Sequence, residues 1–272
     1  MNSGKPLKSS SKIAFRAGYL FLYNTVMKLV VNDPSRKDEA DLLAKELDLS
    51  LADCSDDIHF VLAEDGLSLV EGNLKEKGDF SKMIKRLKPN NLNGEMLIKA
   101  IRIKGRKDLL VYDMTAGMGE DSFLLAAYGY RVEMFESNPY IAALLKDAII
   151  RGRADDNIFP IVNRMNLHVG DSTLLAKELK MRADVVYLDV MFPQRDKKAL
   201  VKKKFQLLHK LAMPCANEEE MLEAAKALKP SKIVVKRPLK SLPLANMKPS
   251  YSIEGKAIRY DCLLLNDGNQ SL

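Results

Sequence analysis

The sequence predicts an α/β protein in which helices cover both faces of a mostly parallel sheet, preceded by a smaller α+β unit. Two observations indicate this fold class. From about Asn93 onward, short apolar runs of strand length alternate with longer runs of helical periodicity, which is the pattern of repeated βαβ units. Before that point the chain shows one strand, one helix and one hairpin in succession, which is typical of a separate α+β unit.

The composition suits one large domain or a domain with a small appendage, because the chain has 272 residues, of which 47% are hydrophobic. No apolar run reaches the roughly 18 residues that a membrane-spanning helix needs. Residues 13–31 come nearest, but Arg16, Asn24 and Lys28 interrupt them and no small-residue cleavage site follows. We therefore expect a cytoplasmic protein without a membrane partner.

The cysteines and histidines indicate neither a disulfide framework nor a metal site. Cys54, Cys215 and Cys262 lie far apart without a C-x-x-C pair, and the three histidines are equally scattered. We expect no bound metal.

Three regions follow one another along the chain. Residues 1–25 begin with a Ser/Lys-rich stretch and are expected to form a poorly defined N-terminal segment. Residues 26–92 are predicted to form the small α+β domain, and residues 93–272 the larger α/β domain.

The elements of the small domain are marked by local signals. Asp33 is a candidate helix cap, and Pro34 suits the first helical position. Asp65 and Gly66 indicate the turn of a hairpin. The predicted elements are a strand at 26–33, a helix at 34–50 and a hairpin at 59–72.

The larger domain shows six apolar runs of strand length, at 108–114, 131–136, 165–171, 183–189, 231–238 and 258–265, with helices expected at 121–129, 138–152 and 172–180. Four of these strands end in an acid, namely Asp113, Glu136, Asp171 and Asp189. In an open α/β sheet the ligand lies beyond the carboxyl ends of the strands, where the strand order reverses. These acids are therefore expected to surround one ligand-binding crevice.

The first turn, "DMTAGMGEDS" (113–122), indicates what that crevice binds. Gly117 and Gly119 allow a tight turn and a close approach of the backbone to a ligand. Ser122 occupies the place of the third glycine of G-x-G-x-x-G, and Glu120 and Asp121 add negative charge where a pyrophosphate needs positive surroundings. A dinucleotide is thus disfavoured. S-adenosylmethionine, which has no phosphates and carries a sulfonium and an ammonium, is favoured.

The other strand ends supply further candidate cofactor contacts. Glu136 is placed to accept both ribose hydroxyls, and Asp171 with Ser172 to reach the adenine. Each feature has a simpler interpretation: the glycines as an ordinary strand-to-helix turn, and Glu136 and Asp171 as helix caps or first-turn acids. Ser137 or Asn138 already supplies a cap for the helix expected at 138–152, so Glu136 is less needed there.

Two basic clusters account for much of the formal charge of +7. Residues 82–107 contain nine Lys or Arg against one acid, Glu95, and residues 195–204 contain six against Asp196. Clusters on either side of one candidate site favour a polyanionic partner. The alternative for the second cluster is the solvated face of an amphipathic helix.

Three stretches, "DMTAGMGEDSFLLAAYGYRVEMFESNPYIAALLKDAIIRG", "VVYLDVMFP…KKALVKKKFQLL" and "VVKRPLKSLPLANMKPS", resemble the RsmJ-type 16S ribosomal RNA guanine-N2 methyltransferases. The resemblance runs from about Gly94 to Leu265. It implies a Rossmann-like methyltransferase fold with a final antiparallel strand, and methylation of the exocyclic amine of a guanine in 16S rRNA of the small ribosomal subunit. It also implies that S-adenosylmethionine contacts Glu120, Asp121, Glu136, Ser137, Asp171, Ser172 and Asp189.

The chain departs from the family pattern at two places. Val190 stands where the family has the first proline of Asp-Pro-Met-Phe-Pro, which affects the rigidity of this loop. Residues 85–95 replace a basic, glycine-rich loop and keep its charge with a single glycine, Gly94.

A guanine amine is a poor nucleophile, so the enzyme has to orient it and stabilise developing positive charge. Asp189 is predicted to accept a hydrogen bond from the amine, and Phe192 to stack on the base. Flanking phosphates are expected to contact Arg195, Lys197, Lys198, Lys202, Lys203, Lys204, Lys236 and Arg237. Two alternatives stay open: an amino-methyltransferase for another nucleic acid or small amine, and a non-catalytic RNA-binding assembly factor, which only Val190 favours.

Overall fold

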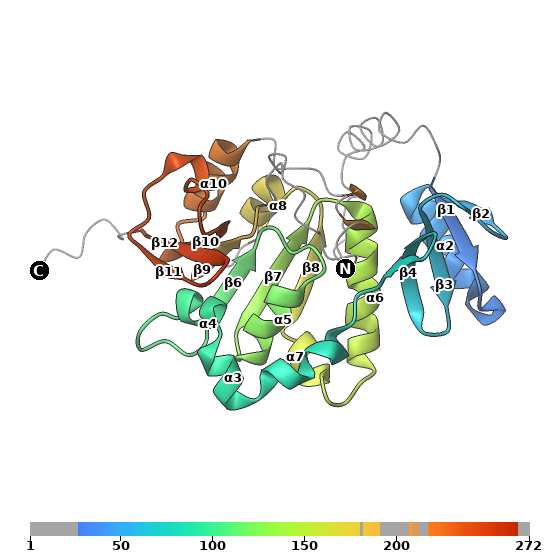
Figure 1. The fold of residues 1–272 in the computed structure, drawn as a ribbon, viewed down its shortest axis with the longest axis horizontal. Helices are drawn as coiled ribbons and strands as arrows, with labels where there is room; N and C mark the ends of the chain where they lie inside the picture. Colours follow the sequence, from blue (N-terminus) through green and yellow to red (C-terminus); the bar gives the residue numbers. More distant parts are fainter. Residues whose placement is uncertain (1–26, 180–181, 191–206, 209, 212–216, 266–272) are drawn as a thin grey trace, which may run out of the picture. The chain divides into compact units, whose positions relative to one another are not determined.

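The computed structural model describes residues 27–179, 182–190, 207–208, 210–211 and 217–265 (Figure 1). The chain divides into two compact units between Lys75 and Glu76. Residues 76–92, expected in the smaller domain, belong to the second unit. The reason is packing, because Phe80 and Met83 are buried in the hydrophobic core of that unit.

The first unit is built on a five-stranded sheet in the order β2-β1-β3-β4-β5. β1 pairs in parallel with both β2 and β3, and β3 forms an antiparallel hairpin with β4. Its elements are β1 (Lys28–Val31), η1 (Pro34–Arg36), α2 (Lys37–Leu47), β2 (Ser50–Ala52), β3 (His59–Ala63), β4 (Gly66–Glu71) and β5 (Leu74–Glu76). The sequence pattern does not predict the short strands β2 and β5.

Local signals place most of these boundaries. Asp33 caps η1, accepting a hydrogen bond from the Ser35 amide at 3.0 Å. The helix ends at Leu47, three residues earlier than expected, because Asp48 adopts a left-handed φ of 56°. The hairpin turns one residue earlier than expected, because Gly66 already pairs with Ala63.

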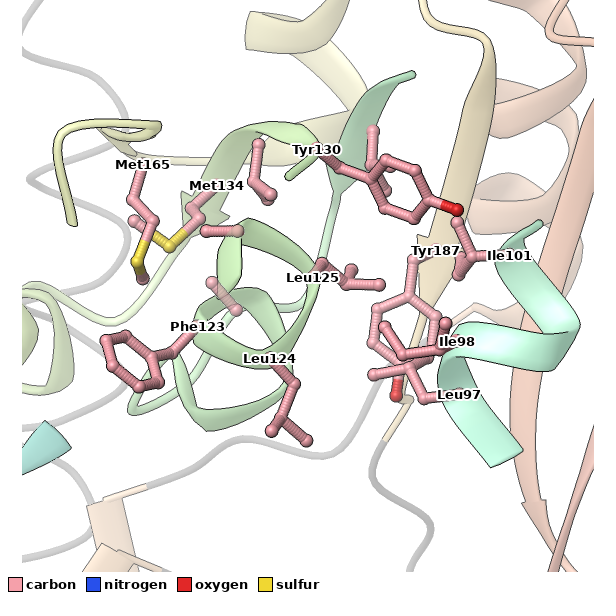
Figure 2. Close-up of a cluster of buried hydrophobic side chains, with 14 of the residues drawn as sticks. Leu97, Ile98, Ile101, Phe123, Leu124, Leu125, Tyr130, Met134, Met165 and Tyr187 are labelled. Atoms are coloured by element: carbon pink, nitrogen blue, oxygen red, sulfur yellow. The ribbon is translucent and has the colours of Figure 1, made fainter. Parts of the chain in front are cut away.

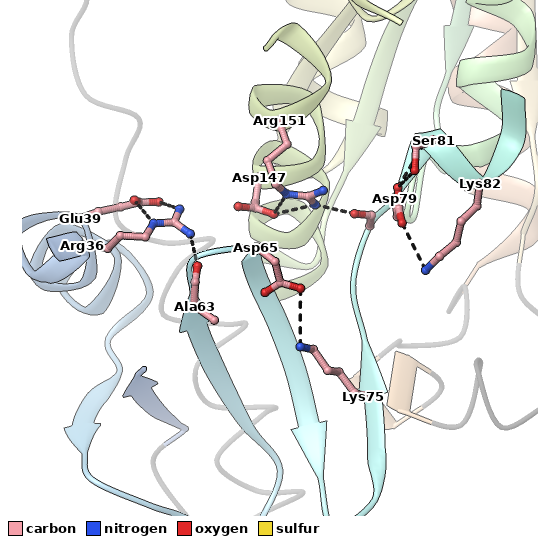
Figure 3. A network of polar contacts seen from close by, with 11 residues as sticks. Arg36, Glu39, Ala63, Asp65, Lys75, Asp79, Ser81, Lys82, Asp147 and Arg151 are labelled. Atoms are coloured by element: carbon pink, nitrogen blue, oxygen red, sulfur yellow. Dashed lines mark hydrogen bonds and ion pairs between the residues drawn. The ribbon is translucent and has the colours of Figure 1, made fainter. Parts of the chain in front are cut away.

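Arg36 ties the start of α2 to the sheet of the first unit. Its guanidinium donates to both carboxylate oxygens of Glu39 and to the carbonyl of Ala63 at the end of β3 (Figure 3). Such forked guanidinium contacts fix geometry as well as charge. The helix is therefore anchored beside the hairpin.

The second unit contains a seven-stranded sheet in the order β11-β12-β10-β9-β6-β7-β8. All neighbouring pairs from β10 to β8 are parallel, whereas β12 runs antiparallel to both β10 and β11. The predicted parallel sheet with a final antiparallel strand is thus confirmed. The sheet also contains β11, which the sequence pattern does not predict. The strands are β6 (Leu110–Asp113), β7 (Arg131–Glu136), β8 (Met165–Val169), β9 (Val185–Leu188), β10 (Lys232–Pro238), β11 (Tyr251–Glu254) and β12 (Ile258–Leu264).

Helical segments precede and connect the strands. Residues 85–95, which replace a basic, glycine-rich loop of the family pattern, are largely helical, and Asn138 caps the helix after β7 through its side chain. The segments are η2 (Phe80–Leu87), α3 (Pro89–Gly94), α4 (Met96–Ile101), α5 (Glu120–Ala127), α6 (Pro139–Arg153), α7 (Phe159–Val162), α8 (Ser172–Glu178), α10 (Glu218–Ala227) and η3 (Leu244–Asn246). Within the described ranges, every helix falls short of the length and apolar character that a bilayer-spanning segment needs.

Two hydrophobic cores cover the two faces of this sheet, because side chains alternate along each strand. On one face, Val185 and Tyr187 of β9 join Leu97 and Ile98 of α4 and Phe123 of α5 (Figure 2). On the other face, the intervening strand residues join the buried residues of α8 and α10. Burial on both faces explains the nearly continuous apolar runs of these strands.

The start of the second unit is fastened to α6. Arg151 pairs with Asp147 one turn earlier on the helix, at 2.8 Å, and also donates to the carbonyl of Gly78 (Figure 3). Gly78 packs so closely on α6 that a Cβ there would lie 2.7 Å from Ala148 Cβ. This contact explains why the segment after Lys75 folds with the larger unit.

Candidate active site

The strand order of the second unit reverses between β6 and β9, which is where ligands bind in open α/β sheets. Asp113 ends β6, and Asp189 directly follows β9. The hydrogen bond from the Asp189 amide to Thr115 Oγ1, 2.6 Å long, joins the two strand ends. The fold therefore brings together residues that lie far apart in sequence.

Asp113 braces the turn that follows β6. Its side chain is buried, and its carboxylate accepts hydrogen bonds from Ser122 Oγ (2.6 Å) and the Thr115 amide (3.1 Å). Burial raises the pKa of Asp113 to about 7, although both hydrogen bonds oppose this change. With 1% of its surface exposed, Asp113 supports the turn and does not present its carboxylate to a ligand, contrary to its expected cofactor contact.

The two glycines of the turn have different reasons to be glycine. Both adopt left-handed conformations, with φ of 55° at Gly117 and 73° at Gly119. A Cβ on Gly119 would lie 2.7 Å from Leu145 Cδ1 of α6, whereas one on Gly117 would meet nothing within 4 Å. Gly119 thus permits close helix packing, and open space adjoins the backbone at Gly117.

Glu136, at the end of β7, holds this turn in place. Its Oε2 accepts from the Gly117 amide at 2.9 Å, and its Oε1 from the Asn138 amide at 2.7 Å. Burial raises the pKa of Glu136, and the backbone donors counteract that rise. Because Asn138 supplies the cap of α6, Glu136 is not the helix cap. Ser137 between them is exposed.

The end of β8 shows a simpler arrangement. Asp171 is the N-cap of α8 and accepts from the amide and the hydroxyl of Thr173, both at 2.8 Å. This is the capping role that the sequence left open for Asp171. Ser172 is 5% exposed, and its hydroxyl lies 3.9 Å from the sulfur of Met221 on α10.

A network of charges lies where α5 approaches β9 and β10. Lys236 Nζ lies 2.8 Å from Asp121 Oδ2 and 2.8 Å from Asp189 Oδ2. The hydroxyl of Tyr187 donates to the same Asp121 oxygen at 2.7 Å. Burial opposes the charge of Lys236, but the two carboxylates prevail and raise its pKa. Glu120 precedes Asp121 in the first turn of α5.

The strand register explains this convergence. In the parallel pair β9–β10, Tyr187 lies opposite Val234, so the alternation of side chains brings Asp189 and Lys236 to the same face two residues later. Tyr260 of β12 pairs with Lys236, and its ring lies 6.5 Å from that of Tyr187.

Val190 packs in the second hydrophobic core and is 4% exposed. Its burial and the bond of Asp189 to Thr115 supply two restraints on the start of the loop. Apolar contact and a backbone hydrogen bond thus hold the segment where the family pattern has a proline.

The expected RNA contacts differ in their surroundings. Arg237 is 4% exposed and donates to the carbonyl of Leu242 and to Glu218, so its guanidinium is engaged within the protein and is not placed for a phosphate. The ammonium of Lys236 donates to the carboxylates of Asp121 and Asp189. Seven residues lie outside the described part of the chain: Phe192, Arg195, Lys197, Lys198, Lys202, Lys203 and Lys204.

The basic cluster at 82–107 does not all lie beside the site. Lys232, the first residue of β10, donates to the carbonyl of Arg102 at 2.7 Å, and Arg106 pairs with Asp184 just before β9 at 2.7 Å. This part of the cluster therefore lies at the amino-terminal edge of the strands, opposite the carboxyl ends that carry the site.

Sequence reasoning missed three residues of this region: Thr115, Tyr187 and Tyr260. A signal existed for Tyr187, since a hydroxyl two residues before Asp189 in an otherwise aliphatic strand shares its face. Thr115 follows the first strand of the sheet closely, where turn residues meet ligands or neighbouring strands. Tyr260 depends on pairing with a distant strand, so no local pattern could have identified its place.

A family model for SAM-dependent methyltransferases matches residues 42–265. A ribosomal RNA small subunit methyltransferase J from Pseudomonas syringae pv. tomato is 38% identical over 80% of this chain and 84% of its own length. The chain belongs to this methyltransferase family. The enzyme of the same name from Thioalkalivibrio sulfidiphilus is 38% identical over 83% of this chain and 92% of its own length.

A solved structure shows the same architecture. A SAM-dependent methyltransferase from Neisseria gonorrhoeae superposes with a TM-score of 0.71 at 26% identity, covering 90% of this chain and 98% of that one. The fold is accordingly that of the Rossmann-like methyltransferases, and the cofactor is S-adenosylmethionine.

The described residues fit this cofactor. Open space adjoins Gly117, whose amide is held by Glu136, and the acidic residues around the turn suit a sulfonium better than a phosphate. Among the residues that the structure describes, no group of three or more His, Cys, Asp or Glu is arranged to hold a metal ion.

Proposed function

We propose that this enzyme methylates the exocyclic N2 amine of a guanine in 16S rRNA of the small ribosomal subunit, in the cytoplasm. The main observation that supports this proposal is the position of the Asp189 carboxylate. It lies beside the glycine turn, where the strand order reverses between β6 and β9. The relatives named ribosomal RNA small subunit methyltransferase J support rRNA as the substrate.

The cofactor supplies an electrophilic methyl group. Glu136 is proposed to bind the ribose hydroxyls, because it ends β7 beside the glycine turn and a carboxylate has about four acceptor sites, more than its three backbone donors use. Glu120, Asp121, Ser137, Asp171 and Ser172 are proposed to complete the cofactor contacts, all at or near the carboxyl ends of the strands.

Asp189 is proposed to accept a hydrogen bond from the guanine amine and to favour the positive charge that develops on nitrogen. Its side chain is 40% exposed, so a base can reach it. The backbone bond to Thr115 fixes its position, which orientation of a weak nucleophile requires.

The RNA is proposed to be held by its phosphates and recognised by its base. Phe192 would stack on the extruded guanine, at about 1–3 kcal/mol per base. The phosphates would contact the basic residues of the following segment, Arg195, Lys197, Lys198, Lys202, Lys203 and Lys204. These assignments rest on the sequence alone.

The decisive experiment is mass mapping of 16S rRNA from cells that lack the protein, followed by transfer assays on their small subunits. We expect one guanine to lose a methyl group on N2, and the purified protein to restore it. An unchanged modification pattern would refute the proposal, and cofactor binding without transfer to any ribosomal substrate would favour a non-catalytic assembly factor.

Asp189→Ala is expected to reduce the single-turnover rate on the order of 10²–10³-fold, as found for other single groups that stabilise developing charge. Asp261→Ala is not a suitable control, because Asp261 is buried in an ion pair with Arg259. The exposed Asp108, just before β6, is the better match. Full activity in Asp189→Ala, with Asp108→Ala also active, would remove Asp189 from the mechanism.

A further inference from the structure

Lys236 has a role that its position in sequence did not indicate. Its ammonium lies between the carboxylates of Asp121 and Asp189, 2.8 Å from one oxygen of each, and its side chain is 24% exposed. An ammonium has three donors, and two of them are directed at these carboxylates. The charge of Lys236 is therefore used inside the protein.

The two carboxylates come from different parts of the site. Asp121 lies in the first turn of α5, directly after the glycine turn, and its oxygen also accepts from the Tyr187 hydroxyl. Asp189 follows β9, where transfer is proposed. Lys236, near the end of β10, therefore joins the cofactor side of the site to the substrate side.

The charge of Lys236 offsets the acidic surroundings of Asp189. Asp113 of β6 and Asp121 of α5 are both acidic, whereas Lys236 is the one cation among the described groups that act on its charge. Tyr187 of β9 and Tyr260 of β12 stay neutral, because burial raises the pKa of each. Burial raises the pKa of Asp189, Lys236 lowers it, and Asp121 raises it again.

We propose that Lys236 is a positioning residue for methyl transfer, which keeps the carboxylate of Asp189 anionic and fixed relative to Asp121. This inference rests on the proposed function, because it presupposes that Asp189 receives the acceptor amine. Lys236 acts through Asp189 and does not touch the substrate.

The test is Lys236→Met, which removes the charge and keeps most of the apolar stem. The maximal transfer rate is expected to fall on the order of 10–100-fold at neutral pH. Activity needs the anion of Asp189, which is present above the pKa of that group and disappears as the pH falls through it. Since removal of Lys236 raises this pKa, the acidic limb of the pH–rate profile should move to higher pH.

Two variants separate positioning from a merely structural role. Lys236→Arg retains a permanent positive charge and should return the acidic limb toward that of the wild type. Lys226→Met is the matched control, since Lys226 forms an ion pair of the same length, 2.8 Å, with Glu223 on the surface of α10. It should leave both the rate and the profile unchanged.

A readout without cofactor or substrate completes the design. A carbon-13 NMR titration of the Asp189 carboxyl in the cofactor-free protein should show the same upward shift in Lys236→Met. If that variant folds poorly, Asp121→Asn can be combined with Lys236→Met. Asp121, Asp189 and Lys236 together carry one negative charge in the wild type, from two carboxylates and one ammonium, and the double variant keeps one negative charge on Asp189. This double variant is judged by the Asp189 titration alone, because Asp121 is itself a proposed cofactor contact. Since Lys236 lowers the pKa of Asp189 and Asp121 raises it, the upward shift should be smaller than in Lys236→Met.

The outcomes are distinguishable. An unshifted Asp189 titration, or a rate that falls equally at every pH, would overturn the role of Lys236. If the wild-type protein transfers no methyl group to rRNA, the proposed function fails, and the titration still decides whether Lys236 keeps Asp189 anionic.

Discussion

Asp113 shows how one buried carboxyl supports the turn while burial raises its pKa to about 7. It lies behind the glycine turn, where Ser122 and Thr115 donate to it, and the charged groups that act on it within the described residues are both acids. A carboxyl in such a place costs stability once it must ionise. The contribution of Asp113 to the free energy of unfolding therefore decreases as the pH rises, whereas that of a paired surface carboxylate increases.

Asp113→Asn tests this contribution. The folded pKa of Asp113, about 7, lies above the unfolded value of 3.8, so the folded state holds the proton longer. Stability is fully present below the unfolded pKa and decreases as the pH rises through the folded one. Between pH 5 and pH 8 the wild type should lose roughly 2–3 kcal/mol of unfolding free energy relative to Asp113→Asn.

Urea unfolding at several pH values measures this difference, with Asp108→Asn, an exposed acid just before the same strand, as the control. Parallel stability curves for wild type and Asp113→Asn across this range would show that Asp113 is ionised throughout.

Glu136→Ala tests the cofactor site. The change removes the acceptor of the Gly117 amide and the proposed partner of the ribose hydroxyls. Affinity for S-adenosylmethionine should fall by about 1.5–3 kcal/mol, the range for hydrogen bonds to a charged group, or roughly 10–150-fold. Calorimetry measures it, with Glu254→Ala on the exposed end of β11 as the control. Unchanged affinity in Glu136→Ala would contradict the assignment, as would tight binding of NAD by the wild type.

At the scale of elements, the glycine turn and α6 depend on each other. The turn approaches α6 so closely that a side chain at Gly119 would collide with Leu145, although the same addition at Gly117 meets open space. Substitutions at Gly117 and Gly119 therefore separate the free-energy cost of backbone strain from the cost of disturbed packing against α6.

Gly117→Ala should destabilise the protein by about 1–2 kcal/mol, the cost of a left-handed conformation for a residue with a Cβ. Gly119→Ala carries this cost and a collision with Leu145, so it should lose roughly a further 1–3 kcal/mol. Denaturant unfolding of both variants measures the difference. Equal losses would mean that α6 yields to the added methyl group without cost.

At the scale of the whole molecule, the described basic residues of the larger unit lie at both edges of its sheet, with Lys236 at the site and Arg102 and Arg106 at the opposite edge. The site occupies the carboxyl edge of the strands, whereas the end of the 82–107 cluster lies at the amino-terminal edge. If RNA docks at the site, the basic residues at 195–204 should contribute more to RNA binding than those at the end of the 82–107 cluster.

Salt dependence of RNA binding distinguishes the two sets. Replacement of Lys202, Lys203 and Lys204 by Gln should flatten the slope of log affinity against log salt by roughly 2–3, since each phosphate that is no longer neutralised lowers the slope by about 0.7–0.9. The same change at Lys99, Lys104 and Lys107 should alter the slope by less than about 0.9. Cofactor affinity should be unchanged in both triple variants. An unaltered slope in the first variant would identify those lysines as a solvated helix face.

The sequence by itself determined the α/β class, the order of the main strands and the position of the glycine turn. These features depend on local patterns: two-residue alternation, apolar runs bounded by turn residues, and caps such as Asn138 before Pro139. Motifs of this kind also carried the resemblance to a methyltransferase family, which the family model and the relatives confirm. The short strands β2, β5 and β11 were not predicted, because three or four residues are too few to show a periodic pattern.

Only the tertiary structure decided which charged groups meet. Lys236 and Arg237 are adjacent in sequence and both were expected to contact RNA, yet alternation along β10 sends one to Asp121 and Asp189 and the other into contact with Glu218. Those partners depend on the register of β10 against β9 and on where α5 begins. Such contacts join residues that lie 47 and 115 positions apart, so no local pattern contains them.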